Sequence, residues 1–278
     1  MMDRTALAPI VSAEWLAARL AAVKVADSRW YLDGRSGIAA YRSGHIPGAV
    51  FVDLERWLSG PASAEAGRHP LPAPAVFAEG MGRAGIADAD TVIAYDDAGG
   101  VVAARLVWML RVTGHAAALL DGGIGAWTGP LEQVAAHPAP ATFGPRPWPP
   151  DHLASSDAVA ARAGRVLDAR PRARYRGEGD PVDPRSGHIP GAVSLPCREH
   201  LDASGRFLPV PELRRRFAQA GVTEGSPVIA YCGSGVSACH NLLALELAGL
   251  GPGRLFPGSW SQWSRDPARP VAAGDEPG

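Results

Sequence analysis

Short apolar runs alternate with longer apolar-rich or amphipathic stretches along the chain. The runs at 23–27, 92–95 and 227–231 have the length of buried strands. The apolar-rich stretch 239–250 predicts a helix, and Ser12 is a candidate N-cap for the first helix of the chain. Because strands alternate with helices, we expect an α/β fold whose mainly parallel sheets carry helices on both faces.

An eight-residue sequence, Ser-Gly-His-Ile-Pro-Gly-Ala-Val, occurs twice, at 43–50 and at 186–193. Each copy lies between an Asp-x-Arg sequence and a Val-Ile-Ala-Tyr run. This period is too long for a solenoid, so it indicates a duplicated domain. The element is present in both halves, but only one half has a cysteine after Val-Ile-Ala-Tyr. We therefore interpret His45 and His188 as structural residues of a turn that proline and glycine fix.

A proline-dense segment separates the two halves. Seven prolines lie between 129 and 151, at positions 130, 138, 140, 145, 147, 149 and 150. Such a segment is incompatible with a helix or a central strand and predicts an extended linker. We therefore predict a first domain over 1–128, a linker over 129–151 and a second domain over 152–278.

Cys232, at the end of the last Val-Ile-Ala-Tyr run, is the candidate nucleophile. It is followed by Gly-Ser-Gly-Val-Ser and then by the predicted helix. The two glycines allow the backbone to bend around the sulfur, and the amides of 233–238 could form an anion-binding nest at the positive end of the helix. Such a site favours the thiolate. The alternative, a cysteine with only a packing role, fits this specific pattern less well.

The equivalent position of the first half is Asp96, so that half lacks the nucleophile. The loop after Asp96 also lacks the Gly-Ser-Gly spacing. We expect that Asp96→Cys would not create a second active site, because the amides of this loop would not converge on the new sulfur.

Composition excludes several classes of function. The net charge of -1 and the pI of about 6.7 argue against a nucleic acid or an anionic membrane surface as the main partner. Three cysteines make neither a disulfide framework nor a zinc site, and no apolar run is long enough to span a bilayer. We expect no metal or other cofactor, a reducing cytoplasmic location, and a monomer whose two halves bury their own interface.

Two other functions are alternative interpretations of a cysteine at this position. Phosphatases and arsenate reductases also place cysteine between a strand and a helix, but their Cys-x5-Arg pattern needs an arginine to hold a tetrahedral dianion. Here that position is Ala238. A non-catalytic interaction module is the other alternative, and the intact loop around Cys232 disfavours it.

The sequence Cys-Gly-Ser-Gly-Val-Ser-Ala at 232–238 resembles the loop Cys-Gly-Ser-Gly-Val-Thr-Ala of the 3-mercaptopyruvate sulfurtransferases, which belong with the two-domain rhodaneses. The paired Gly-His-Ile-Pro-Gly-Ala elements, Asp-Gly-Gly at 121–123 with Trp127, and Gly-Ser-Trp-Ser-Gln-Trp at 258–263 also match. The resemblance implies two tandem rhodanese-like domains, of which the second is catalytic. It also implies a persulfide on Cys232 that moves sulfur to cyanide, a small thiol or thioredoxin.

The same resemblance implies the roles of individual residues. The loop residues that would bind substrate sulfur are Gly233, Gly235, Val236 and Ser237. A serine-histidine-aspartate relay would fall on Ser234, His69 and, with glutamate for aspartate, Glu55, although Asp53 is close by.

Two arginines hold the donor carboxylate in the mercaptopyruvate enzymes. Arg174 matches the first, but the stretch 178–184 has no arginine for the second, and the nearest is Arg185. A loop without basic side chains favours 3-mercaptopyruvate over the thiosulfate dianion. The missing arginine weakens that preference, so thiosulfate is the alternative donor.

Overall fold

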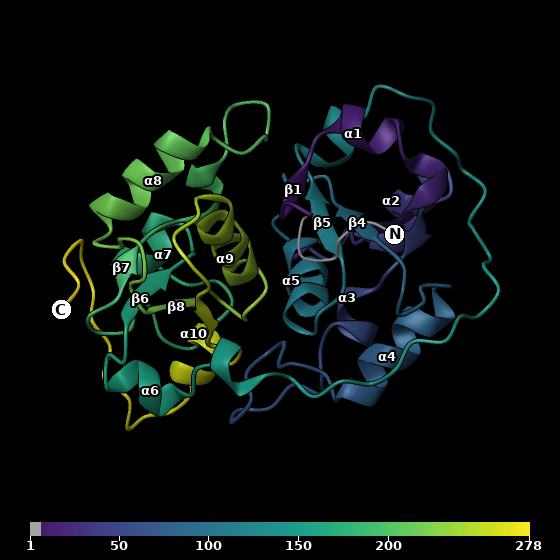
Figure 1. Cartoon of the computed structure of the whole chain (residues 1–278). Helices are drawn as coiled ribbons and strands as arrows, with labels where there is room; N and C mark the ends of the chain where they lie inside the picture. Colours follow the sequence, from purple (N-terminus) through teal and green to yellow (C-terminus); the bar gives the residue numbers. More distant parts are fainter. Residues whose placement is uncertain (1–6) are drawn as a thin grey trace. The chain divides into compact units, whose positions relative to one another are not determined.

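The computed structural model of the chain describes residues 7–278, which form two compact units (Figure 1). The first unit comprises residues 7–60, Pro72–Trp148 and Asp202–Phe207, and the second comprises Pro61–Leu71, Pro149–Leu201 and Leu208–Gly278. Each unit has its own parallel β-sheet, so the predicted α/β fold in two repeated halves is confirmed. Within residues 7–278, no helix has the length and apolar character needed to cross a lipid bilayer.

The first unit contains a five-stranded sheet with the order β1-β5-β4-β2-β3. Its strands are β1 (Ile10–Val11), β2 (Lys24–Asp27), β3 (Val50–Phe51), β4 (Val92–Tyr95) and β5 (Ala117–Leu120). Its helices are α1 (Ala13–Ala17), α2 (Gly37–Ser43), α3 (Leu54–Trp57), α4 (Pro74–Arg83) and α5 (Ala104–Val112), with 3₁₀ turns at Leu20–Ala22 and Gly123–Ala126. Val25 and Ile93 pack with Leu16 of α1 and Tyr41 of α2. Since side chains alternate along a strand, the next residues face the opposite side, and α5 contacts β4 and β5 there.

The second unit contains a four-stranded sheet with the order β7-β6-β8-β9. Its strands are β6 (Arg165–Asp168), β7 (Val193–Ser194), β8 (Val228–Tyr231) and β9 (Arg254–Leu255). Its helices are α6 (Ser156–Ala160), α7 (Arg172–Arg176), α8 (Val210–Gln219), α9 (Ala238–Leu247) and α10 (Ser259–Trp263), with 3₁₀ turns at Pro150–His152 and Cys197–His200. Trp260 and Trp263 of α10 are fully buried against Val166 and Ile229 of the sheet. Figure 1 shows α9 against β8, the strand that leads into the candidate nucleophile.

Local sequence signals set the ends of the helices. The hydroxyl of Ser12 accepts the amide of Trp15 at 3.2 Å, so the predicted N-cap of the first helix is confirmed. The predicted helix at 239–250 is α9, which ends earlier, at Leu247. Its carboxyl end is followed by Gly249, whose φ of +66° a helix cannot continue.

The two histidines of the repeated element have the same structural role in both units. Nδ1 of His45 is 2.8 Å from the carbonyl oxygen of Tyr41, and the His45 ring stacks on the Tyr41 ring at 4.0 Å. His188 makes the same two contacts with Tyr175, at 2.8 and 3.7 Å. These contacts fix the turn and support the interpretation of both histidines as structural.

Two segments cross the predicted domain boundaries. Residues 61–71 belong to the second unit, where the amide of Arg68 donates to the hydroxyl of Ser261 at 2.9 Å. Residues 202–207 belong to the first unit, where the amide of Phe207 donates to Asp121 at 2.8 Å. Neither the repeat nor the proline pattern contains a signal for these excursions.

Most of the proline-dense segment packs on the first unit. The Trp148 indole donates to the carbonyl of Pro72 at 2.8 Å, and the amide of Ala141 donates to the carbonyl of Gly82 at 2.9 Å. Residues 137–149 form neither helix nor strand, as their prolines predict. The segment is therefore extended, but up to Trp148 it is attached rather than free.

A buried histidine in the second unit makes stability depend on pH. His200 packs on Phe217, and burial, with the nearby His240 and Arg216, lowers its pKa to about 3. Below about pH 6.5 this histidine is protonated in the unfolded chain but stays neutral in the folded chain down to about pH 3. Its contribution to the free energy of unfolding is therefore fully present above pH 6.5 and is lost as the pH falls from 6.5 towards 3. We expect His200→Phe to reduce the acid sensitivity of unfolding by up to about 1.4 kcal/mol per pH unit.

The measurement is the urea midpoint between pH 7.5 and 4.5. His137→Phe, at an exposed histidine, is the control and should keep the slope of the unaltered chain. An unchanged slope in His200→Phe would contradict the assignment.

Candidate active site

Cys232 lies where β8 ends, two per cent exposed, in the turn that leads into α9. The amide of Gly235 donates to its sulfur at 3.1 Å. The backbone of Cys232 is held on α10, because its carbonyl accepts the amide of Trp260 at 2.9 Å and its amide donates to the hydroxyl of Ser259 at 3.1 Å. The sulfur therefore faces a backbone amide at the positive end of a helix, an arrangement that stabilises an anion.

A buried ion pair supports the strand that carries this cysteine. Asp168, at the end of β6, accepts a hydrogen bond from the Tyr231 hydroxyl at 2.6 Å and forms a 2.6 Å ion pair with Arg170. Burial acts against the charge of Arg170, but the Asp168 carboxylate outweighs it and raises the Arg170 pKa. The same guanidinium donates to the carbonyl of Gly187 at 2.7 Å, which joins the repeated turn to the strand ends.

The equivalent loop of the first unit is built around the carboxylate of Asp96. Four backbone amides donate to it at 2.7–2.9 Å, those of Ala98, Gly100, Val102 and Ala103. The loop geometry behind our expectation for a cysteine at this position is wrong, because the amides do converge on the side chain at position 96, while the outcome of Asp96→Cys stays a prediction. The reason is local: Gly99 and Gly100 have φ values of +74° and +87°, which bend the longer loop back over position 96. Burial raises the Asp96 pKa, and the four amides oppose that shift.

Ser234 and His69 are brought together, as the relay predicts. Nδ1 of His69 is 2.8 Å from the Ser234 hydroxyl, and both side chains are buried. This places the histidine of segment 61–71 on the loop that holds Cys232. Glu55 belongs to the first unit, where its carboxylate accepts the Trp30 indole N–H at 3.1 Å. Its part in a relay stays a prediction.

Arg174 lies beside the first glycine of the loop. A Cβ at Gly233 would be 3.4 Å from its Nη1. The other edge of the guanidinium is held by carboxylates, with Nη2 at 2.7 Å from Asp180 and 3.0 Å from Asp183. Arg174 thus presents one nitrogen to the loop while its orientation is fixed from behind.

Arg185 does not have the position that our sequence-based assignment requires. Its guanidinium donates to four backbone carbonyls at 2.6–2.8 Å, those of Trp263, Ser264, Asp266 and Arg269. These bonds bind it to the chain that follows α10. Arg185 therefore stabilises the C-terminal segment, and its use as a second donor-binding arginine is corrected.

Arg68 is the residue that sequence reasoning missed. A Cβ at Gly233 would lie 3.2 Å from its Nη2, closer than to Arg174. Its Nη1 forms a 2.9 Å ion pair with Asp183. Arg68 directly precedes His69, and only the placement of that histidine at the loop could have drawn attention to it.

The other two cysteines are buried in the same unit and have packing roles. Burial raises the pKa of the Cys197 thiol to about 12, while a hydrogen bond from the Ser237 side chain acts in the opposite direction. The thiol of Cys239 donates to the carbonyl of Gly235 at 3.3 Å. Ser237, which was predicted to bind substrate, is the N-cap residue of α9. Its side chain forms the hydrogen bond to Cys197, so only its backbone amide belongs to the loop around Cys232.

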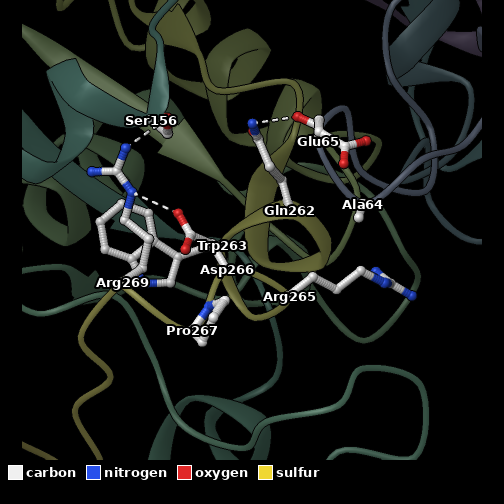
Figure 2. A pocket seen from close by; sticks show the side chains of 9 residues that line it. All are labelled: Ala64, Glu65, Ser156, Gln262, Trp263, Arg265, Asp266, Pro267 and Arg269. Atoms are coloured by element: carbon white, nitrogen blue, oxygen red, sulfur yellow. Dashed lines mark hydrogen bonds and ion pairs between the residues drawn. The ribbon is translucent and has the colours of Figure 1, made fainter.

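A pocket of about 360 Å³ lies beside α10 (Figure 2). It is lined by Ala64, Glu65, Ser156, Gln262, Trp263, Arg265, Asp266, Pro267 and Arg269. Figure 2 shows the side-chain amide of Gln262 donating to the Glu65 carbonyl and Arg269 paired with Asp266. The pocket is lined by Ala64 and Glu65 of segment 61–71 and by no residue of the Cys232 loop. It therefore lies where segment 61–71 contacts α10 and the chain that follows it.

The matching family model describes a rhodanese-like domain, and it matches twice, at residues 12–130 and 152–266. A crystal structure of SseA from Escherichia coli, described as one of the 3-mercaptopyruvate sulfotransferases, superimposes with a TM-score of 0.81 at 33% identity and covers 92% of this chain and 100% of that one. The chain therefore belongs to the two-domain rhodanese family of sulfurtransferases.

Two curated relatives have names that specify donors. A Pseudomonas aeruginosa protein called "Probable 3-mercaptopyruvate sulfurtransferase" is 43% identical over 283 residues, covering 96% of this chain and 99% of that protein. "Thiosulfate/3-mercaptopyruvate sulfurtransferase 2" of Arabidopsis thaliana is 35% identical over 304 residues, covering 95% and 86%. The family and the enzyme class predicted from the Cys232 loop are confirmed.

Proposed function

We propose that the chain transfers sulfur from 3-mercaptopyruvate to a thiophilic acceptor through a persulfide on Cys232. The observation that supports it most directly is the Cys232 sulfur at the start of α9, with the amide of Gly235 donating to it at 3.1 Å. That arrangement stabilises both the attacking thiolate and the terminal sulfur anion of a persulfide.

The first half-reaction joins the Cys232 sulfur to the donor sulfur and breaks the carbon–sulfur bond of 3-mercaptopyruvate. The bonding electrons leave with the enolate of pyruvate, and the proton of the donor thiol ends on its carbon. In the second half-reaction cyanide or a thiolate takes the outer sulfur and restores the Cys232 thiolate. Splitting the transfer in this way is covalent catalysis with ping-pong kinetics.

Ser234 and His69 would manage the proton of the first half-reaction. Their 2.8 Å contact gives a path between the loop and an imidazole, and an enolate needs a proton whereas sulfite does not. The part of Glu55 in such a relay stays a prediction. Among the loop residues, the amides of Gly233, Gly235, Val236 and Ser237 would bind the transferred sulfur.

The charges around Arg174 favour a monoanionic donor. Asp180 and Asp183 already face Arg174, and the loop has no basic side chain. Because these carboxylates offset much of the positive charge near the loop, the site favours a donor with one carboxylate, which the remaining nitrogen of Arg174 can bind, over the thiosulfate dianion. Thiosulfate remains the second candidate donor because the Arabidopsis relative is named for both.

Arg174→Lys tests the donor. A lysine keeps the charge but cannot bind Asp180 and Asp183 and at the same time direct an N–H at the donor carboxylate, so kcat/KM for 3-mercaptopyruvate should fall about tenfold to a hundredfold, with a smaller fall for thiosulfate. The measurement is thiocyanate formation from cyanide with each donor. Equal losses for the two donors would make thiosulfate the better assignment.

The acceptor and the setting complete the proposal. A small thiol, cyanide or thioredoxin would take the sulfur, and the chain would act as a monomer in the cytoplasm without a metal or other cofactor. The three free cysteines are compatible with a reducing compartment. Sedimentation of the purified chain and transfer to reduced thioredoxin test these points.

A further inference from the structure

Two guanidinium groups from distant parts of the sequence meet at Gly233. A Cβ at that position would be 3.2 Å from Nη2 of Arg68 and 3.4 Å from Nη1 of Arg174. Among residues 7–278, neither of these two nitrogens has a protein hydrogen-bond acceptor. Two cationic N–H edges therefore lie next to the residue that follows Cys232.

One buried carboxylate holds both groups. Asp183 has no exposed side-chain surface; its Oδ1 accepts Arg68 Nη1 at 2.9 Å and its Oδ2 accepts Arg174 Nη2 at 3.0 Å. A buried carboxylate that leaves this position would lose two charge-assisted hydrogen bonds. Its two oxygens therefore set the spacing and the orientation of the two arginines.

Arg174 is held further by a second aspartate. Burial opposes the charge on Asp180, but hydrogen bonds from Arg174 outweigh it and keep the Asp180 pKa below its ordinary value. Asp180 and Asp183 thus offset part of the positive charge of Arg68 and Arg174. One more negative charge, brought by a ligand, would find two N–H edges free to receive it.

The backbone of Arg68 is also fixed. Its amide donates to the hydroxyl of Ser261 at 2.9 Å. The preceding residue, Gly67, has a φ of +88°, and a Cβ there would be 2.6 Å from the carbonyl of Gly258. Figure 2 shows the neighbouring contact of the same segment, from Gln262 to the Glu65 carbonyl. Segment 61–71 therefore delivers Arg68 and His69 to the loop from a fixed position.

We propose that Arg68 is the second arginine of the donor site, that Asp183 is its positioning residue, and that the donor carboxylate binds between Arg68 and Arg174. A carboxylate held there would leave the donor sulfur, separated from it by a carbonyl and a methylene group, to reach Cys232. This inference rests on the proposed function. It replaces Arg185, whose guanidinium is held by carbonyls.

The test compares kcat/KM for 3-mercaptopyruvate and for thiosulfate, with cyanide as acceptor. Arg68→Gln should lower the value for 3-mercaptopyruvate about tenfold to a hundredfold, chiefly through KM, with a smaller loss for thiosulfate. Arg68→Lys keeps the ion pair with Asp183 but should still lose selectivity, because an ammonium lacks the planar edge. Arg68→Lys also provides the test of donor selectivity if Arg68→Gln fails to fold. Pyruvate, which keeps the carboxylate, should inhibit both variants more weakly.

Asp183→Asn tests positioning. It should raise KM for 3-mercaptopyruvate with little change in kcat, and its effect should be much smaller in the Arg68→Gln background because the two residues act together. A role in folding alone would give the same added loss in both backgrounds. Arg265→Gln is the matched control: Arg265 lies 3.6 Å from Asp183 but lines the pocket beside α10. In Arg265→Gln the ratio of kcat/KM for 3-mercaptopyruvate to kcat/KM for thiosulfate should be unchanged.

Arg68 variants that keep the donor ratio and the pyruvate inhibition of the unaltered enzyme would overturn the inference while the proposed function stands. An unaltered enzyme that takes sulfur from thiosulfate but not from 3-mercaptopyruvate would overturn both. Mass spectrometry of Cys232 after thiosulfate treatment separates these cases, since it reports whether the cysteine accepts sulfur independently of the carboxylate.

Discussion

Replacing Cys232 with serine is expected to lower sulfur transfer from either donor on the order of a thousandfold or more. A hydroxyl fits the space of the thiol, so the hydrogen bond from Gly235 can form, but it is far less ionised and does not form a persulfide. The measurement is thiocyanate production in the presence of cyanide. Mass spectrometry of the unaltered chain after donor treatment should find one added sulfur on Cys232.

The two other cysteines provide the controls for this experiment. Cys197→Ser and Cys239→Ser should retain most of the activity, because burial keeps Cys197 a thiol and Cys239 donates to a backbone carbonyl. Substantial sulfur transfer by Cys232→Ser would refute the covalent mechanism. Loss of transfer in Cys197→Ser with an intact fold would move part of the chemistry to that residue.

The second large effect is expected on stability, at Asp96. Asp96→Ala would leave the amides of Ala98, Gly100, Val102 and Ala103 buried without their acceptor. Each unpaired buried donor costs about 1–3 kcal/mol, and partial relaxation of the loop reduces the sum, so we expect a loss of about 3–5 kcal/mol in the free energy of unfolding. Urea denaturation followed by tryptophan fluorescence measures it.

Asp97 offers a control in the same loop. Its exposed carboxylate accepts one hydrogen bond, from the Tyr31 hydroxyl at 2.6 Å. Asp97→Ala should therefore cost about 1 kcal/mol or less. If Asp96→Ala were no more destabilising than Asp97→Ala, the four amides would have found water or other partners, and the carboxylate would not be what folds this loop.

The fold could be predicted because its signals are local or repeated. The strand that precedes Cys232 is a run of apolar residues, and the duplicated Gly-His-Ile-Pro-Gly-Ala element revealed two copies of one domain. Duplication also gave an internal control, since a residue needed in both copies is better explained by structure than by catalysis. The contacts of His45 and His188 with their tyrosines agree with that reasoning.

The site could be predicted only where its residues follow one another in the loop. Arg68 reaches Gly233 through segment 61–71, which folds with the second unit although Arg68 and Gly233 are 165 positions apart in the sequence. Arg185 was chosen because it was near in sequence, but carbonyls of the C-terminal segment hold it. The amides around Asp96 were missed because glycine torsions, not residue spacing, decide where a loop points.

The carboxylate of Asp96 suggests a way to stop the catalytic unit at a chosen stage. The first unit carries a carboxylate, bound by four backbone amides, at the position where, in the proposed mechanism, the second unit carries an anionic sulfur, first as thiolate and then as persulfide. Aspartate is thus a stable mimic of that anionic sulfur, and the chain itself carries one in the equivalent loop of the first unit. Cys232→Asp would give a catalytic unit with a fixed carboxylate in place of the anionic sulfur, in which acceptor binding can be studied without turnover.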